Sequence, residues 1–332
     1  MAKRLIEKIR ASGKLPSPIG AAMRVLDMSR DEDVTLVQIA DVISTDPALA
    51  SRILRFANSP FSGVSREVGS IRHAVMMLGV RTVTMLSLGF SLVSDRTSEC
   101  AGFDYNQFWH SSLGCATFSE GLARAKSQVA PDEAFTAGLL ANIGQLAFAS
   151  ACPREYSEVI READGDVGAL LDGERSALGG AHMELSASLL EEWGLPLGMC
   201  EAVRSFRSTP DNVEQASALQ GILYVADELC RRLLPCDRLE AAELQESIRL
   251  VQQYHGVSVD EFMAFFDRAN QERLHLSEIL AVPAMTARSP EEIQAQAEEL
   301  LSELSAESAL EAETARSTKG SVGAGGRVST RP

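Results

Sequence analysis

The sequence predicts an all-α protein. Hydrophobic residues make up 45% of the 332 residues, but aromatic residues only 5%. The core must therefore be built mainly from aliphatic side chains, which suit helices better than strands. Apolar positions recur at helical spacing in one segment after another, and no alternating run competes with them. We expect a multi-helix bundle in two helical lobes, followed by an acidic helix and a disordered tail.

The first lobe is expected over residues 15–94, after a short N-terminal helix at 1–14. Thr35 begins a helix, with Gln38 three residues later as in a capping box. Asp46 and Pro47 separate this helix from the next, because proline suits the first helical position and the Asp46 carboxylate can accept backbone N–H groups there. A further helix should end at Gly79, with its successor starting at Val80 or Arg81.

The second lobe is expected over residues 103–285. Pro131 is a helix start and the Gly194-Leu195-Pro196 segment is a helix stop. The expected helices are 105–126, 132–151, 154–162, 181–193, 197–205 and 213–234. Residues 286–316 form the acidic amphipathic helix, and 317–332 form the tail, which is rich in Gly, Ser, Thr and Arg.

The formal net charge of −15 repels nucleic acid at long range. The acidic helix carries much of it, since residues 289–315 hold eight glutamates and no Lys or Arg. Only the helical body could offer a basic face, and its candidate cluster is Arg52, Arg55, Arg66, Arg72 and Arg81.

Two apolar stretches, 74–94 and 134–153, are long enough to span a membrane. Both are interrupted by Gly or polar residues and lack flanking anchors, so we interpret them as buried helices. The six cysteines form no Cys-x-x-Cys pair, and the first ten residues contain charges instead of an apolar signal segment. These features predict a cytoplasmic protein with reduced thiols and no membrane partner.

Five segments of the first lobe carry a family resemblance. They are LPSP at 15–18, the helical run 34–40, STDPAL at 44–49, RFANS at 55–59, and 70–82 with its LGVRT ending. In this order they resemble the HDOD family, which comprises bacterial signalling domains related to HD phosphohydrolases. The resemblance continues to about Leu234, and it implies an HD-like helical fold and a role in signalling.

The resemblance also identifies where HD enzymes hold their metal ions. Those positions fall on Ser111, Ala141, Asn142, Phe206 and Arg207, and only His182 and Asp227 keep a ligand-type side chain. His110 is one residue early and should point elsewhere. One imidazole and one carboxylate fall short of the three protein ligands that a hydrolytic metal normally needs. We therefore expect no catalytic residue, no metal and no cofactor.

His182 and Asp227 each leave an alternative open. His182 is either a functional remnant or a histidine bonded to a carboxylate such as Glu184 or Asp227. Asp227 is either a ligand or a buried carboxylate satisfied by arginine or backbone donors.

Candidate binding residues lie mainly at the corners of the first lobe. A phosphate-bearing second messenger would favour two guanidiniums together, and the alternative is that these arginines pair with Asp46 or cap helix ends. The candidate set is Asp46, Arg52, Arg55, Asn58, Arg81 and, in the second lobe, Arg207.

The leading functional hypothesis is a non-catalytic regulatory module of bacterial signal transduction. It would bind signalling proteins, and a nucleotide second messenger is a candidate ligand. The alternatives are a degenerate metal-dependent phosphodiesterase of the HD type and, with less support, a nucleic-acid-binding regulator. The sequence leaves the oligomeric state open.

Overall fold

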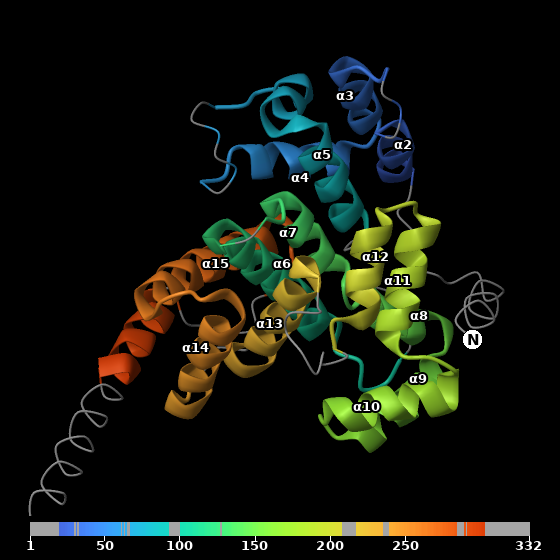
Figure 1. The fold of residues 1–332 in the computed structure, drawn as a ribbon. Helices are drawn as coiled ribbons and strands as arrows, with labels where there is room; N and C mark the ends of the chain where they lie inside the picture. The colour runs from blue at the N-terminus through green and yellow to red at the C-terminus, as the bar shows by residue number, and fades with distance from the viewer. Residues whose placement is uncertain are drawn as a thin grey trace, which may run out of the picture.

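The computed structural model describes residues 20–302, except 30, 32, 61, 63, 65–66, 93–99, 127, 208–216, 235–238, 284–288 and 290. Across the residues it describes, the regular structure is helical throughout, as predicted (Figure 1). Expectations for 1–14, 303–316 and 317–332 concern residues outside this range.

The first four helices form the upper group in Figure 1: α2 (Ala21–Met28), α3 (Leu36–Ser44), α4 (Pro47–Ala57) and α5 (Ile71–Leu92). The expected capping box is present, since Thr35 Oγ1 accepts from the Gln38 amide at 3.3 Å and Gln38 Oε1 accepts from the Thr35 amide at 2.9 Å. Asp46 Oδ1 accepts from the amides of Ala48 and Leu49. Local side-chain chemistry therefore sets both helix starts.

Helix α5 bends sharply at Gly79, so its second half runs down beside the other lobe (Figure 1). Gly79 has φ 81° and ψ 158°, a conformation that is open to glycine and costly for other residues. The predicted helix end at Gly79 is therefore a bend between two helical halves. The second half packs against α7 and joins the two groups of helices.

The second group contains α6 (Tyr105–Lys126), α7 (Pro131–Leu140), α8 (Ile143–Ala151), α9 (Pro153–Ala163), α10 (Val167–Gly173), a π-helical turn η1 (Glu174–Leu178), α11 (His182–Glu192), α12 (Leu197–Ser205), α13 (Ala218–Leu233), α14 (Ala241–His255) and α15 (Val259–Ile279). Several expectations need correction. The single helix expected over 132–151 is divided at Ala141 and Asn142. Helices also occupy four segments where none was expected: α2, α10 with η1, α14 and α15.

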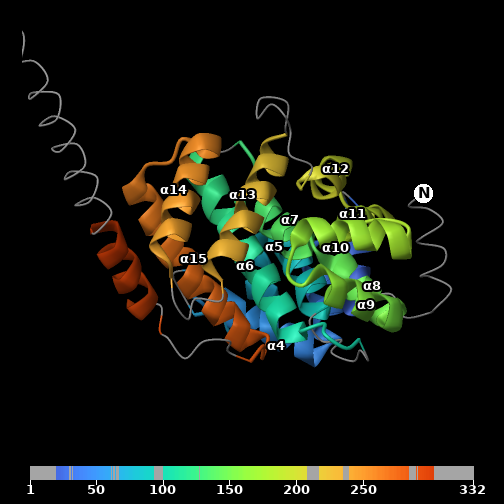
Figure 2. The ribbon, with the colours of Figure 1, turned by 90° about the horizontal axis from the view of Figure 1, so that it is seen from below.

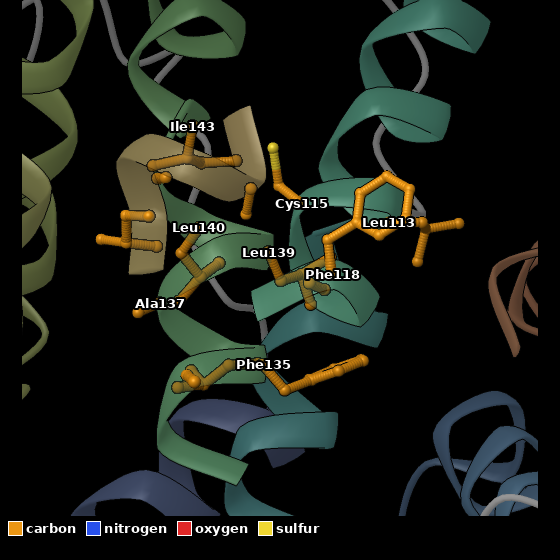
Figure 3. Packing of buried hydrophobic residues seen from close by; sticks show 14 of the residues in the cluster. Leu113, Cys115, Phe118, Phe135, Ala137, Leu139, Leu140 and Ile143 are labelled. Atoms are coloured by element: carbon orange, nitrogen blue, oxygen red, sulfur yellow. The ribbon is translucent and has the colours of Figure 1, made fainter. Parts of the chain in front are cut away.

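Helix α6 lies at the centre of this group, with α13, α14 and α15 on one side and α8, α9 and α10 on the other (Figure 2). Its side chains Leu113, Cys115 and Phe118 lie beside those of α7 (Figure 3). The Phe118 ring also stacks on Phe266 of α15, with ring centroids 6.2 Å apart and planes 7° from parallel. Cys115 acts here as a small apolar residue.

The five cysteines within the described residues are buried free thiols: Cys100, Cys115, Cys152, Cys200 and Cys230. Cys236 lies outside the described residues. Residues 131–151 have the length and mean hydropathy of a membrane span, but 83% of their 18-residue apolar window is buried inside the protein. They pack as a core segment. The other apolar stretch passes the same test only if Ile71–Val80 and Thr82–Leu92, which are bent by 109°, are taken together.

The acidic C-terminal helix is docked on the body where it is described, at residues 291–302. Its apolar stripe places Ile293 and Ala297 at 0% exposure. Gln296 adds two hydrogen bonds to the backbone of Leu239, donating to the carbonyl at 3.1 Å and accepting from the amide at 3.3 Å. The stripe predicted from the sequence is therefore an intramolecular packing face.

Candidate functional site

A cavity of about 260 Å³ opens between α6, α9, α10 and α13, at the position where the resemblance places the lost metal site. One part of its wall is aromatic and aliphatic, and another part is polar. The polar lining residues are Asp104, Gln107, Ser111, Ser112, Asn142, Gln145, Asp166, Arg207, Asp227 and Arg231. Four residues singled out by the sequence, Ser111, Asn142, Arg207 and Asp227, therefore meet around one cavity.

Asp227 is the centre of the polar wall. Arg207 Nη2 donates to its Oδ1 at 2.8 Å, and Asn142 Nδ2 lies 3.4 Å from the same oxygen. Arg231, one helical turn later on α13, places Nε 3.3 Å from Oδ2. Two guanidiniums thus surround a carboxylate that is 6% exposed, and the Arg207 guanidinium also lies 5.5 Å from the Phe206 ring centroid. Two alternatives were open for Asp227, a ligand or a buried carboxylate satisfied by arginine, and these contacts are those of the second.

His182 lies at the start of α11 and is fully buried against Glu174. The Glu174 carboxylate faces His182 Nδ1 at 2.8 Å and also accepts from the His182 backbone amide at 2.8 Å. Tyr156 donates its hydroxyl to the same carboxylate at 3.2 Å. Burial, followed by the negative charge of Glu174, raises the pKa of Tyr156 well above its usual value. The histidine is therefore bonded to a carboxylate, and its partner is Glu174 instead of Glu184 or Asp227.

The contact between Glu174 and His182 depends on two local features of the backbone. The π-helical turn η1 begins at Glu174 and ends at Leu178, and it is followed by Gly179, which has φ 90°. Gly144 lets α8 approach α11 closely, because a Cβ at this position would overlap the His182 carbonyl oxygen. Gly144 also donates its amide to Ser186 Oγ at 2.8 Å. The other ring nitrogen of His182, Nε2, lies 3.4 Å from Nε2 of Gln145, and Gln145 lines the cavity.

These residues do not fit a catalytic metal ion. The described residues contain no group of three or more His, Cys, Asp or Glu side chains placed to share an ion. Both oxygens of Asp227 already contact cationic or amide donors. The Arg207 guanidinium beside that carboxylate would repel a cation, since it carries its charge at every physiological pH.

The candidate residues of the first lobe have structural partners. Asp46 caps α4, as described above, and Arg52 donates to the Phe90 carbonyl. Arg55 Nη1 lies 3.4 Å from the Ile279 carbonyl of α15. Asn58 holds Val68, accepting from its amide at 2.7 Å and donating to its carbonyl at 2.9 Å. The side chain of Arg81 and all of Arg66 lie outside what the structure describes.

Arg207 is therefore the one binding candidate that lies at the cavity of the second lobe. Arg52 and Arg55 bind carbonyl groups that fix α4 against α5 and α15, which agrees with the alternative that these arginines bind helix carbonyls. His110 points away from the cavity, as expected. Its Nε2 is 2.6 Å from the Pro283 carbonyl and its Nδ1 is 3.2 Å from Arg273 Nη1. Burial lowers the pKa of His110.

Sequence reasoning missed Tyr156, Glu174, Gln145 and Arg231. Arg231 could have been found from the sequence, because it follows Asp227 by four residues and so lies on the same helix face. No signal in the sequence indicated the π-helical turn that brings Glu174 to His182. Such turns differ from an α-helix by one residue and leave no periodicity of their own.

Comparisons with known proteins give the family and the fold. Residues 15–208 match the HDOD domain family. A curated but uncharacterized protein of Treponema pallidum (strain Nichols) is 27% identical over 236 residues, which cover 70% of this chain and 45% of that protein. The chain thus spans less than half the length of that relative.

Two solved structures are similar in fold. An HDOD domain protein of unknown function from Geobacter sulfurreducens has a TM-score of 0.62 and 23% identity, with 84% of this chain and 99% of that chain covered. A protein from Shewanella amazonensis SB2B, named as a candidate phosphohydrolase, has a TM-score of 0.65 and 26% identity, with 83% of this chain and 97% of that chain covered.

Proposed function

Because this chain belongs to the HDOD domain family, we propose that it is a non-catalytic regulatory module of bacterial signal transduction, which acts by binding signalling proteins in the cytoplasm. The observation that carries the proposal is the pairing of Arg207 with Asp227. In a hydrolytic HD site, a metal ion would neutralise this carboxylate and activate water. Here the neutralising charge is a guanidinium, which cannot lose a proton or bind water as a Lewis acid.

His182 supports the same proposal. Its Nδ1 faces a fully buried carboxylate and its Nε2 faces an amide, with no second imidazole beside it among the described residues. The arrangement fixes the ring in place, which suits a structural role. A cavity in which Arg207 binds Asp227 and Tyr156 binds Glu174 is suited to recognition.

The first experiment tests catalysis directly. Purified protein is incubated with Mn²⁺ and bis(p-nitrophenyl) phosphate, and its metal content is measured. We expect no bound metal and no turnover above that of the Arg207→Ala and His182→Ala variants. Metal-dependent turnover that disappears in His182→Ala would contradict the proposal and favour the phosphodiesterase alternative.

The second experiment addresses the partner. The chain is crosslinked in cells under mild conditions and the captured signalling proteins are identified, then each is purified and its affinity is measured. A direct, saturable complex in which the partner's activity changes supports the regulatory role. If every purified candidate fails to bind, or binds without any change in its activity, the proposal is wrong.

We propose that nucleic acid is not a partner. Arg52 and Arg55 bind backbone carbonyls, and Arg72 is paired with Asp41 at 2.9 Å. These contacts occupy three members of the candidate basic cluster. A gel-shift titration at low and moderate salt should show no complex, whereas a salt-sensitive complex would contradict this part of the proposal.

A further inference from the structure

The polar wall of the cavity contains an acceptor and a donor without partners among the described residues. They are Asn142 Oδ1 and Arg207 Nε, both buried. Their side chains lie close together because each donates from another nitrogen to the same oxygen of Asp227. The Asn142 amide cannot be turned around, since its oxygen would then face that carboxylate. The Asp227 carboxylate therefore determines the orientation of the Asn142 amide and leaves Asn142 Oδ1 as the unpaired acceptor.

Unpaired buried polar atoms are costly, because each has lost its hydrogen bonds to water without gaining a partner. Asn142 is 7% exposed, and both Asn142 and Arg207 line the cavity. Both atoms lie beneath the cavity surface, so one ligand edge can serve both of them only after the two side chains turn towards the cavity. Such an edge must offer an N–H to Asn142 Oδ1 and, beside it, an acceptor to Arg207 Nε.

The charges around the cavity disfavour an anionic ligand. The lining contains three carboxylates, Asp104, Asp166 and Asp227, against two guanidiniums, Arg207 and Arg231. Both guanidiniums lie against Asp227. The other two carboxylates cap helices: Asp104 accepts from two amides of α6, and Asp166 accepts from one amide of α10. A phosphate would have to displace Asp227 from its cations in a site with an excess of negative charge.

The apolar wall favours a flat body. Phe103 lies 5.6 Å from Phe108 and 6.0 Å from Tyr156 between ring centroids, and all three line the cavity. The volume of about 260 Å³ is just below the usual range for drug-sized ligands, roughly 300–1,000 Å³. The space therefore suits a single ring or a fused pair of rings.

We propose that this cavity binds a small, flat, uncharged molecule whose edge places a hydrogen-bond donor beside an acceptor, as in a carboxamide, a lactam or a free nucleobase. The proposal rests on the proposed regulatory function and deepens it by naming the class of ligand. It also replaces the expected phosphate-bearing messenger with a neutral ligand.

The test compares neutral molecules with anionic counterparts that share the same ring. Nicotinamide, uracil and hypoxanthine are titrated against nicotinate, orotate and inosine 5′-monophosphate, and binding to the full chain is followed by protein-observed NMR. At least one neutral molecule should bind at or below millimolar concentration, about tenfold or more tighter than its anionic counterpart. If no neutral molecule binds, or if the anions bind equally well, the proposal is wrong.

Variants locate the binding. Leu170 and Leu171 are consecutive half-buried residues of α10, but only Leu170 lines the cavity. Leu170→Trp should abolish binding by filling the space, and Leu171→Trp should preserve it. Asn142→Leu should weaken the neutral ligand about tenfold or more by removing the acceptor. Binding that survives Leu170→Trp would place the ligand elsewhere and overturn the proposal.

The two proposals can fail separately. Capture of a signalling partner with no neutral ligand in the cavity would overturn only the ligand class. Metal-dependent hydrolysis would overturn the regulatory function whatever the cavity binds.

Discussion

Glu174 accepts a hydrogen bond from the backbone amide of His182 and also contacts its ring Nδ1, each at 2.8 Å. The two residues are eight positions apart, and neither side chain has any exposed surface. The carboxylate thus fixes both the start of α11 and the orientation of the imidazole. Because both groups are shielded from water, removing either should leave polar atoms unsatisfied.

Glu174→Ala should lower the free energy of unfolding by about 3–5 kcal/mol, because a buried charge or donor group loses its partner. Glu174→Gln should cost less, since one acceptor oxygen remains. Urea denaturation measures both. Glu184→Ala is the matched control, because Glu184 lies nearby on α11 with a side chain that is 34% exposed. Its cost should stay within about 0.5 kcal/mol, and an equal loss in Glu174→Ala and the control would contradict the assigned role.

Arg207→Ala should lower the free energy of unfolding by about 2–3 kcal/mol, because Asp227 loses its closest charged donor in a nearly buried site. Arg231→Ala should cost clearly less, since Arg231 is 38% exposed and solvent screens its charge. In the double variant Arg207→Ala/Asp227→Ala, the loss should be smaller than the sum of the single losses. Strict additivity would show that the two groups do not stabilise one another.

Glu272 should make stability fall as pH rises. Burial, reinforced by the charge of Glu120, raises the pKa of Glu272 to about 8 in the folded protein. Arg268 and Arg124 act in the opposite direction but are outweighed. Between the ordinary glutamate pKa and this value, the folded state binds a proton that the unfolded state has lost. The contribution of Glu272 to stability should therefore decrease across this range, with a maximum slope of about 1.4 kcal/mol per pH unit, whereas the buried His110 and His255 act with the opposite sign because their pKa values are lowered.

Glu272→Gln should flatten this part of the pH profile of unfolding. The control is Glu278→Gln, because Glu278 is exposed on the same helix. It should retain the decrease of the parent protein. A Glu272→Gln profile that runs parallel to that of the parent protein would show that Glu272 is ionised in the folded state.

Ile293→Ala should release the acidic helix from the body. Ile293 is fully buried, and truncating such a side chain costs about 2–5 kcal/mol of packing. Since the helix can detach without the rest unfolding, limited proteolysis should cut this segment much faster in the variant. Glu299→Ala, an exposed change on the same helix, should leave the cleavage rate unchanged. Equal rates for both variants would contradict docking through the apolar stripe.

The fold class and several helix starts could be predicted because their causes are local. The caps at Thr35 and Asp46 depend on residues within three positions of each other. The break at Gly79 was visible too, since glycine permits its positive φ. The division between α7 and α8 was not predicted. Asn142 and Gly144 interrupt the apolar run there, but such residues also occur inside continuous buried helices, so their types alone do not indicate a break.

The sequence by itself determined the helical fold and the family resemblance, both of which follow from residue types and their spacing. Only the tertiary structure decided that Arg207 binds Asp227, that Glu174 binds His182, and that Asn142 and Arg207 leave an acceptor and a donor beside one cavity. The reason is physical. The hydrogen bonds of buried polar groups depend on distances between helices, and those distances are set by the packing of residues far apart in the chain.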